Sequence, residues 1–353
     1  MKHYSCSVCA NTIYFENSLC LSCQNPLGFD PSQLSMLTLK HHTNAIYQNR
    51  AENGLTYRYC KNSQEGNCNW LIKADSPNAY CIACELNRTI PPLTKPEYKK
   101  KWTKIEMSKH RLIYSLLRFN LPVNKKTNNS ENGIAFDFMV DTSWKKKVFT
   151  GHNNGIITIN IDEADETELS KNKSFLGEKY RTLLGHFRHE IGHYYWTLLI
   201  KNTPLIHKYR QLFGDERQDY EGSLKRYYYS NRPVNWSNQY ISMYATSHSW
   251  EDWAETWAHY MHMMDTLETA YSLGFQLQPQ FSSTSTMHVA VLTDPYTIQN
   301  FNQIFTMWKS LSLAMNSLNR SMGHTDFYPF IISPIVVEKL TFIHEVASVH
   351  CIK

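Results

Sequence analysis

Apolar residues recur at helical intervals through most of the chain beyond residue 93. The clearest run extends from Glu178 to Ile200, where aromatic and aliphatic side chains dominate and no proline occurs. A repeat of about 3.6 residues is typical of an amphipathic helix, so this run predicts one. Similar patterns predict further helices at about 97–118, 202–213, 217–229, 250–272, 297–319 and 334–346.

Two shorter segments have the patterns of β-strands. Apolar residues alternate from Gly133 to Asp141, and a β-branched run follows from Gly155 to Ile161. Helices outnumber strands in this reading. The sequence therefore predicts an α+β protein, in which a cysteine-rich N-terminal segment precedes a mostly helical body with a small sheet.

Length and composition set the expected domain organisation. With 353 residues, 42% of them hydrophobic, the chain can bury a full core and is expected to fold as one small and one large unit. The stiff, proline-rich segment from Ile90 to Pro96 marks the boundary, which gives domains at 1–92 and 93–353. No run of 18 apolar residues occurs, so we expect no membrane span.

Eight of the nine cysteines fall within the first 84 residues, in two sets of four. Where two residues separate a pair, a tight turn points both sulfurs at one ion, and four thiolates complete a closed tetrahedral zinc site. The sets therefore predict a double zinc ribbon with two structural Zn²⁺ ions. The ligands are Cys6, Cys9, Cys20 and Cys23 at the first site and Cys60, Cys68, Cys81 and Cys84 at the second.

The surroundings of these cysteines favour metal binding over disulfides. Residues 1–5 lead directly into Cys6 without an apolar stretch, so we expect no signal peptide and no disulfide framework. Reduced thiols without a targeting segment indicate a cytoplasmic protein. Cys351, the ninth cysteine, is expected to be an unpaired, reduced thiol.

The sequence His189-Glu190-Ile191-Gly192-His193 lies inside the helix predicted at 178–200. Positions i and i+4 of a helix share one face, so both imidazoles can reach a single metal ion. Glu190 projects beside them, where its carboxylate can take a proton from a metal-bound water. This arrangement is the core pattern of a zinc hydrolase.

A catalytic zinc takes three protein ligands and keeps one position open, so a third donor must come from elsewhere. A histidine six residues beyond His193 is excluded, because position 199 is leucine. A second predicted helix, in which Ser249 and Asp252 form a capping box, carries Glu251 and Glu255 one turn apart. We predict Glu251 as the ligand and Glu255 as an acceptor that orients a ligand histidine, with the reverse assignment also open.

The neighbouring residues each allow a functional and a structural interpretation. Paired carboxylates one turn apart are often a solvated helix face, but three tryptophans and two alanines surround this pair, which favours an enclosed site. Tyr244 stands seven residues before Glu251, where it could donate to the oxyanion of a tetrahedral intermediate or be a core tyrosine. His186 stands one turn before Glu190 and could tune that base, although a hydrogen-bonded structural histidine is the simpler interpretation.

The charge of the chain is only mildly positive, with 36 Lys and Arg against 31 Asp and Glu and a net charge of +5. Seven basic residues nevertheless gather between 95 and 111, next to Trp102. Such a cluster beside a zinc ribbon can contact the phosphates of nucleic acid. A solvated face of an amphipathic helix explains it more simply.

Long blocks of the sequence resemble a family of bacterial zinc-ribbon proteins described as zinc-binding metallopeptidases. The resemblance rests on residues 68–71, 88–91, 155–160, 180–196, 213–217, 250–260 and 319–323. One small departure is Ser249, where the family pattern has proline. The tyrosine seven residues before Glu251 is similar to the one in glutamate zincins of the lethal-factor type, which favours Glu251 over Glu255 as the ligand.

This resemblance implies a glutamate-zincin peptidase that acts on a peptide or protein. His189, His193 and Glu251 would hold one catalytic Zn²⁺, and Glu190 would be the general base. A different interpretation is a zinc-ribbon protein that binds nucleic acid or a partner protein and carries a non-catalytic zincin body. A metal hydrolase that cleaves a non-peptide amide is a third.

Overall fold

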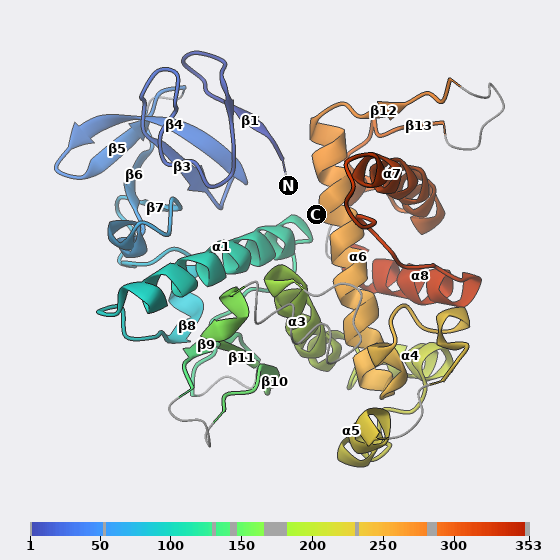
Figure 1. Cartoon of the computed structure of the whole chain (residues 1–353). Coiled ribbons are helices and arrows are strands. Elements are labelled where there is room, and N and C mark those ends of the chain that lie inside the picture. Colours follow the sequence, from blue (N-terminus) through green and yellow to red (C-terminus); the bar gives the residue numbers. More distant parts are fainter. Residues whose placement is uncertain are drawn as a thin grey trace. The chain divides into compact units, whose positions relative to one another are not determined.

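The computed structural model describes residues 2–51, 54–128, 132–141, 147–165, 182–229, 233–280 and 288–349. The chain divides into two compact units, Met1–Asp165 and Glu166–Lys353 (Figure 1). The first unit holds most of the strands and the second most of the helices, which confirms the predicted α+β class. Residues 93–165 group with the cysteine-rich segment, so an independent domain at 1–92 stays a prediction. Cys351 lies outside the described residues.

The first unit opens with a short hairpin and a five-stranded antiparallel sheet in the order β3-β4-β5-β6-β7. The hairpin strands are β1 (Tyr4–Ser5) and β2 (Thr12–Ile13). The sheet consists of β3 (Leu27–Asp30), β4 (Ser35–Thr43), β5 (Ile46–Asn49), β6 (Thr56–Tyr59) and β7 (Leu71–Lys73). Leu37, Leu39, Tyr57 and Leu71 form one buried cluster of this sheet. Phe29 of β3 is also buried and packs against Phe15, Trp70 and Tyr114.

A second sheet, in the order β10-β11-β9-β8, lies in the same unit. Its strands are β8 (Asn87–Thr89), β9 (Ala135–Met139), β10 (Gly151–Asn153) and β11 (Ile156–Asn160). The strands predicted at 133–141 and 155–161 are therefore confirmed. β8 begins three residues after Cys84 and pairs in parallel with β9, where Arg88 forms an ion pair with Asp137. The cysteine-rich segment thus continues into this sheet.

Helix α1 spans Pro96–Arg118, in agreement with the helix predicted at 97–118. Its apolar side chains Trp102, Ile105 and Leu112 are fully buried. A solvated face was the simpler interpretation of the basic cluster at 95–111, and for Lys109 it is wrong. Its ammonium group is buried and lies 2.9 Å from a carboxylate oxygen of Glu106 one turn away.

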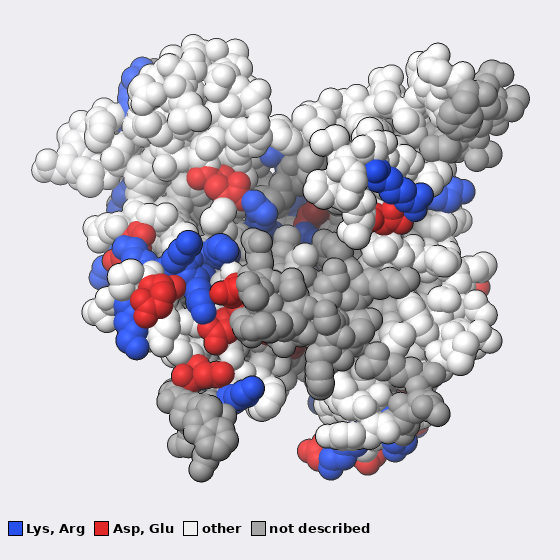
Figure 2. Space-filling model, viewed as in Figure 1, with Lys and Arg blue, Asp and Glu red and all other residues white. Residues whose placement is uncertain are grey.

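Three of the other six basic residues at 95–111 are paired with acidic ones. Lys99 pairs with Glu65 at 2.8 Å, Lys101 with Asp162 at 2.6 Å and Arg111 with Glu16 at 2.7 Å. Figure 2 shows basic and acidic side chains interleaved over the part of the first unit that carries α1. Neutralised charges of this kind favour a structural face over a phosphate-binding one.

The second unit is mostly helical. Its helices are α3 (Leu183–Leu199), α4 (Leu205–Phe213), α5 (Tyr220–Tyr229), α6 (Ser249–Ser272), α7 (Phe301–Ser321) and α8 (Pro334–Ser348). β12 (Gln276–Leu277) and β13 (Val289–Ala290) form a two-stranded sheet. All predicted helices beyond residue 178 are found, with their ends moved by a few residues. Within the described residues, no helix is long and apolar enough to cross a membrane.

Helices α3 and α6 cross closely at Gly192. A Cβ atom at this position would lie 3.2 Å from Ala254 Cα and 3.2 Å from Trp257 Cβ. The carbonyl oxygen of Gly192 also accepts a hydrogen bond of 2.9 Å from the indole nitrogen of Trp253. A glycine inside a helix costs stability through its chain entropy, and here the close approach of the two helices requires it.

Two buried ion pairs tie α6 to its neighbours on either side of this crossing. Arg188 of α3 pairs with Asp265, and Lys339 of α8 lies 2.6 Å from a carboxylate oxygen of Asp252. All four side chains are buried. Because a buried charge without a partner is costly, these pairs restrict how α3 and α8 can sit against α6.

Candidate active site and metal centres

Helix α3 supplies both histidines and the glutamate between them. Thr182 caps its N-terminus, with the side-chain oxygen accepting a hydrogen bond of 3.0 Å from the amide of Gly185. His189 and His193 then fall one turn apart on the same face, with ring centroids 4.9 Å apart. Both rings are buried, so they face the interior of the second unit.

Helix α6 supplies the two candidate carboxylates. It begins at Ser249, and its N-cap is His248, so the predicted capping box at Ser249 was wrong. Nδ1 of His248 accepts a hydrogen bond of 3.1 Å from the amide of Trp250, which leaves Nε2 to donate to the carbonyl oxygen of Gln218 at 3.2 Å. The imidazole thus performs the capping role that the sequence assigned to the hydroxyl.

His189, His193 and Glu251 converge at one point. Their donor atoms all lie within 4.8 Å of one another. Glu251 Oε2 lies 3.0 Å from His189 Nε2, and Glu251 Oε1 lies 3.5 Å from His193 Nε2. Donors on a tetrahedral zinc with bonds of 2.0–2.1 Å are separated by about 3.3 Å, so these spacings suit a shared ion.

The burial of Glu251 also suits a metal ligand. Its side chain is 1% exposed. Burial by itself raises the pKa of this carboxyl, but His193 and His189 hold it well below the usual value. A carboxylate kept ionised in the interior needs a cationic partner, and two imidazoles with one carboxylate form a donor set typical of catalytic zinc.

Glu255 lies on the far side of the His189 ring from Glu251. Its Oε1 atom is 2.7 Å from His189 Nδ1, while its Oε2 atom accepts a hydrogen bond of 2.5 Å from the hydroxyl of Ser242. A carboxylate on Nδ1 fixes the ring so that Nε2 faces the other ligands, as in many zinc sites. Sequence reasoning missed Ser242, because no spacing pattern links it to Glu255.

Tyr220 is a second residue that the sequence did not reveal. Its hydroxyl donates a hydrogen bond of 2.6 Å to Glu251 Oε1, the oxygen nearer to His193. Its ring packs against Trp250, which in turn packs on His193 with centroids 4.1 Å apart. The first residue of α5 therefore holds the carboxylate in place. Neither motif nor periodicity could have assigned this role.

Tyr244, the predicted oxyanion donor, packs beside His189. Its ring centroid is 5.9 Å from that of His189, and it also packs against Tyr227 of α5. Burial raises the pKa of Tyr244 well above its usual value, and the nearby Glu251 carboxylate adds to this rise. The phenol therefore stays protonated and can donate a hydrogen bond.

The remaining predicted residues of the site are Glu190 and His186. Both lie on α3, and Glu190 is buried while His186 is half-buried. Burial raises the pKa of Glu190, against a lowering influence from His189 and His193. A role for His186 in tuning Glu190 stays a prediction.

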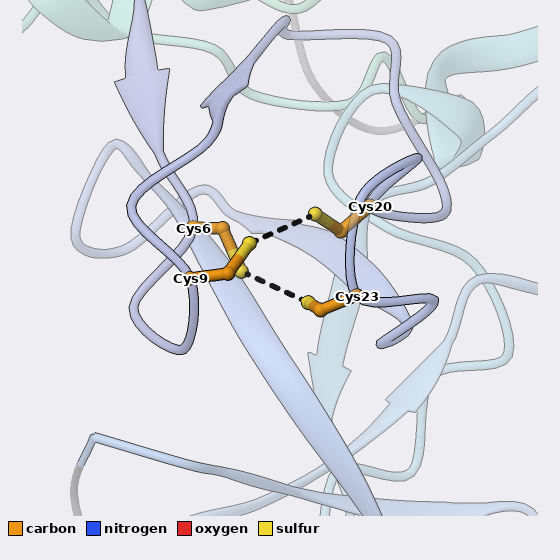
Figure 3. A group of neighbouring side chains, drawn as sticks. All are labelled: Cys6, Cys9, Cys20 and Cys23. Atoms are coloured by element: carbon orange, nitrogen blue, oxygen red, sulfur yellow. Dashed lines mark hydrogen bonds between the residues drawn. The ribbon is translucent and has the colours of Figure 1, made fainter.

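The first cysteine set in the N-terminal unit is assembled from two knuckles (Figure 3). Cys6 and Cys23 sulfurs are 3.6 Å apart, as are those of Cys9 and Cys20. All four sulfurs lie within 4.8 Å of one another. Four thiolates on a tetrahedral zinc with bonds of 2.3 Å are separated by about 3.8 Å, so this set fits a structural ion.

The second cysteine set is equally compact and more deeply buried. The sulfurs of Cys60, Cys68, Cys81 and Cys84 lie within 4.8 Å of one another. The backbone amide of Trp70 donates to the Cys68 sulfur at 3.4 Å, and the amide of Cys81 donates to the Cys60 sulfur at 3.3 Å. Amides directed at sulfur stabilise thiolates, which are the form that binds metal.

Comparison with known families adds independent evidence. A sequence model of the family described as "Putative zinc-binding metallo-peptidase" matches residues 98–346, and one described as "zinc-ribbon domain" matches residues 3–95. The chain belongs to this metallopeptidase family. These matches confirm the resemblance to zinc-binding metallopeptidases and the predicted N-terminal zinc-ribbon region.

Relatives of the chain occur in mycobacteria. Uncharacterized proteins of Mycobacterium bovis and Mycobacterium tuberculosis are each 36% identical to it over 349 residues. The matched region covers 99% of this chain and 96% of each relative, so the similarity includes both the ribbon and the helical body. No solved structure matches the chain.

Proposed function

We propose that this protein is a zinc-dependent peptidase whose catalytic ion is held by His189, His193 and Glu251. The observation that carries the proposal is the convergence of these three buried donors within 4.8 Å, with Glu190 on the same helix as the histidines. Membership of the zinc-binding metallopeptidase family supports it. The substrate is expected to be a peptide or a protein.

Each neighbouring side chain has a role in the proposed reaction. A Zn²⁺ ion held by these ligands would act as a Lewis acid that can polarise a carbonyl and activate a water near neutral pH. Glu190 would accept a proton at its carboxylate and pass it to the departing amine, which its raised pKa favours. Glu255 orients His189, and the protonated phenol of Tyr244 donates to the developing oxyanion.

The ribbon would add two structural zinc ions, which gives three ions per chain. The eight described cysteines are free thiols grouped as metal donors, an arrangement typical of a reducing compartment. We therefore propose a cytoplasmic location.

The test is the variant Glu190→Gln, assayed on an unstructured protein such as casein. We expect it to keep three zinc ions per chain and to lose cleavage by about 10²–10⁴-fold, because the amide cannot accept the proton. Glu345→Gln, which alters an exposed ion pair on α8, is the matched control and should retain full activity. Cleavage at the original rate by Glu190→Gln, or only two zinc ions in the unsubstituted chain, would reject the proposed mechanism.

A further inference from the structure

Lys339 of α8 is a buried lysine that joins two other segments of the second unit. Its Nζ atom lies 2.6 Å from Oδ2 of Asp252 and 2.7 Å from the backbone carbonyl oxygen of Gln239. The same group lies over the ring of Tyr240, 4.5 Å from its centroid. Lys339 is only 3% exposed, although lysine is among the residues that are least often buried. Its partners therefore decide where the end of this side chain lies.

The contact with Asp252 lies at the start of α6. Asp252 directly follows Glu251, the proposed zinc ligand, and both belong to the first turn of the helix. The Asp252 side chain is fully buried. Because a buried carboxylate needs a partner, Lys339 holds this first turn against α8.

The contact with Gln239 lies at the start of the segment that carries Tyr244. This segment, residues 239–247, ends directly before the N-cap of α6. Near its middle, the hydroxyl of Ser242 donates a hydrogen bond of 2.5 Å to Oε2 of Glu255. Tyr244 lies two residues further on, in a short 3₁₀ turn. The segment is thus attached to α8 at its first residue and to α6 near its middle.

These attachments matter for the role proposed for Tyr244. An oxyanion donor must stand within hydrogen-bond distance of the developing charge, and a displacement of about 1 Å can lower a rate by about 10²-fold. The ring contacts of Tyr244 with His189 and Tyr227 are packing contacts, which do not fix one direction. The hydrogen bonds at Gln239 and Ser242 are directional and fix the backbone that leads to Tyr244.

We propose that Lys339 is a positioning residue for Tyr244, and that it acts by fixing the segment 239–247 relative to the first turn of α6. One nitrogen atom joins the two parts, because it donates both to Gln239 and to Asp252. The proposed zinc ligand and the proposed oxyanion donor are thereby held at a fixed separation. Lys339 acts through Tyr244 and not on the substrate. This inference rests on the proposed function for the role of Tyr244.

The first test is a set of variants of the full chain, assayed on casein at saturating zinc. Lys339→Met keeps the length of the side chain and removes its donors, so it should lower kcat about 10–10²-fold and leave KM and the zinc content unchanged. The same substitution should have almost no further effect in Tyr244→Phe, because the phenol that it positions is already absent. Losses of kcat that multiply in the double variant would overturn the inference, and so would an unchanged kcat in Lys339→Met.

A neighbouring residue controls for a general loss of stability. Leu340→Ala opens a cavity in the same helix, since Leu340 is fully buried, and it keeps both hydrogen bonds of Lys339. At a temperature where each chain is folded, this variant should retain the kcat of the unsubstituted chain, and a loss equal to that in Lys339→Met would overturn the inference. If Lys339→Met fails to fold with Asp252 unpaired, adding Asp252→Asn removes the buried charge. This double variant should still lose kcat, because the bond to Gln239 is missing.

Amide hydrogen exchange tests the attachment without any peptidase activity. Several amides of residues 239–247 are hydrogen-bonded within the segment. In Lys339→Met their exchange should become about 10-fold faster or more relative to the amides of α3, whereas in Leu340→Ala this ratio should stay the same. Unchanged exchange in Lys339→Met would overturn the inference whether or not the chain cleaves casein. An unsubstituted chain that cleaves nothing would instead count against the proposed function, so the two failures are distinguishable.

Discussion

Glu255 accepts a hydrogen bond from His189 on Nδ1, with the two atoms 2.7 Å apart, while Glu251 faces Nε2 of the same ring at 3.0 Å. One imidazole therefore separates the two carboxylates and gives them different roles. The carboxylate on Nδ1 orients the ring, and the one on the Nε2 side shares the point where His193 also converges. This relationship supports Glu251 as the zinc ligand and Glu255 as the orienting acceptor.

The two assignments predict different losses of zinc. Glu251→Gln should lose the ion of the helical body and keep the two ribbon ions, because a neutral amide is a poor substitute for an ionised ligand. Glu255→Gln should keep all three ions but bind that of the body about 10–100-fold more weakly. Zinc per chain and competition with a chelator measure both. The opposite pattern would favour the reverse assignment.

Substitutions of Tyr220 and Tyr244 should have different effects, one on zinc binding and the other on catalysis. Tyr220→Phe removes the donor to Glu251 Oε1 and is expected to weaken zinc binding about 10-fold or more. Tyr244→Phe should leave zinc affinity unchanged and lower kcat by about 10²-fold or more, because the loss falls on the transition state. Steady-state kinetics at saturating zinc, together with zinc titration, distinguishes the two. If Tyr244→Phe left kcat unchanged, its role would be one of packing.

Gly192→Ala should destabilise the second unit although alanine favours helices. The added Cβ must displace α6 atoms at 3.2 Å, and overpacking of this kind costs about 1–3 kcal/mol, against a gain of about 1 kcal/mol in helix propensity. We expect a net loss of roughly 1 kcal/mol in urea unfolding and weaker zinc binding, since His193 is the next residue. Gly151→Ala, where nothing lies within 4 Å of the added Cβ, should leave zinc binding unchanged.

Because His259 is buried, we expect the free energy of unfolding to decrease in mild acid. Burial lowers the pKa of this histidine to about 4, from 6.5 in the absence of the fold, although Glu255 opposes the shift. Between those values the unfolded chain binds a proton that the folded chain does not, so the free energy of unfolding falls as the pH decreases. From pH 7 to pH 5 this single group accounts for about 2 kcal/mol.

The variant His259→Gln isolates this contribution. Its amide can still meet the hydroxyl of Tyr328, which lies 2.8 Å from Nδ1 of His259. Urea titrations of both chains at pH 7 and pH 5, under the same metal conditions, should show a smaller loss for the variant by about 2 kcal/mol. If the free energy of unfolding decreased equally in both chains, His259 would have the same pKa in the folded and unfolded states.

Several features of the fold could be predicted because they are local. The helix around His189 followed from apolar periodicity, and the strands at 135–139 and 156–160 followed from alternation and a β-branched run. Cys6 and Cys9, like Cys20 and Cys23, are close in space because only two residues separate each pair. The cap of α6 could not be predicted, since His248 caps only with help from the carbonyl of Gln218, 30 residues away.

By itself, the sequence determined which cysteines form knuckles and which imidazoles share a helix face. Both depend on spacings of only a few residues, and at such short range backbone geometry fixes the distance between the side chains. Only the tertiary structure decided the rest. Glu251 and Glu255 have the same local pattern, and the crossing of α6 over Gly192 decides which side of His189 each one meets. The contacts of Tyr220 with Glu251 and of His110 with Cys84 join residues 31 and 26 positions apart in the chain. Contacts between residues so far apart in the chain are decided by packing. A buried charged group needs a partner, and that partner can come from any segment that the fold brings beside it.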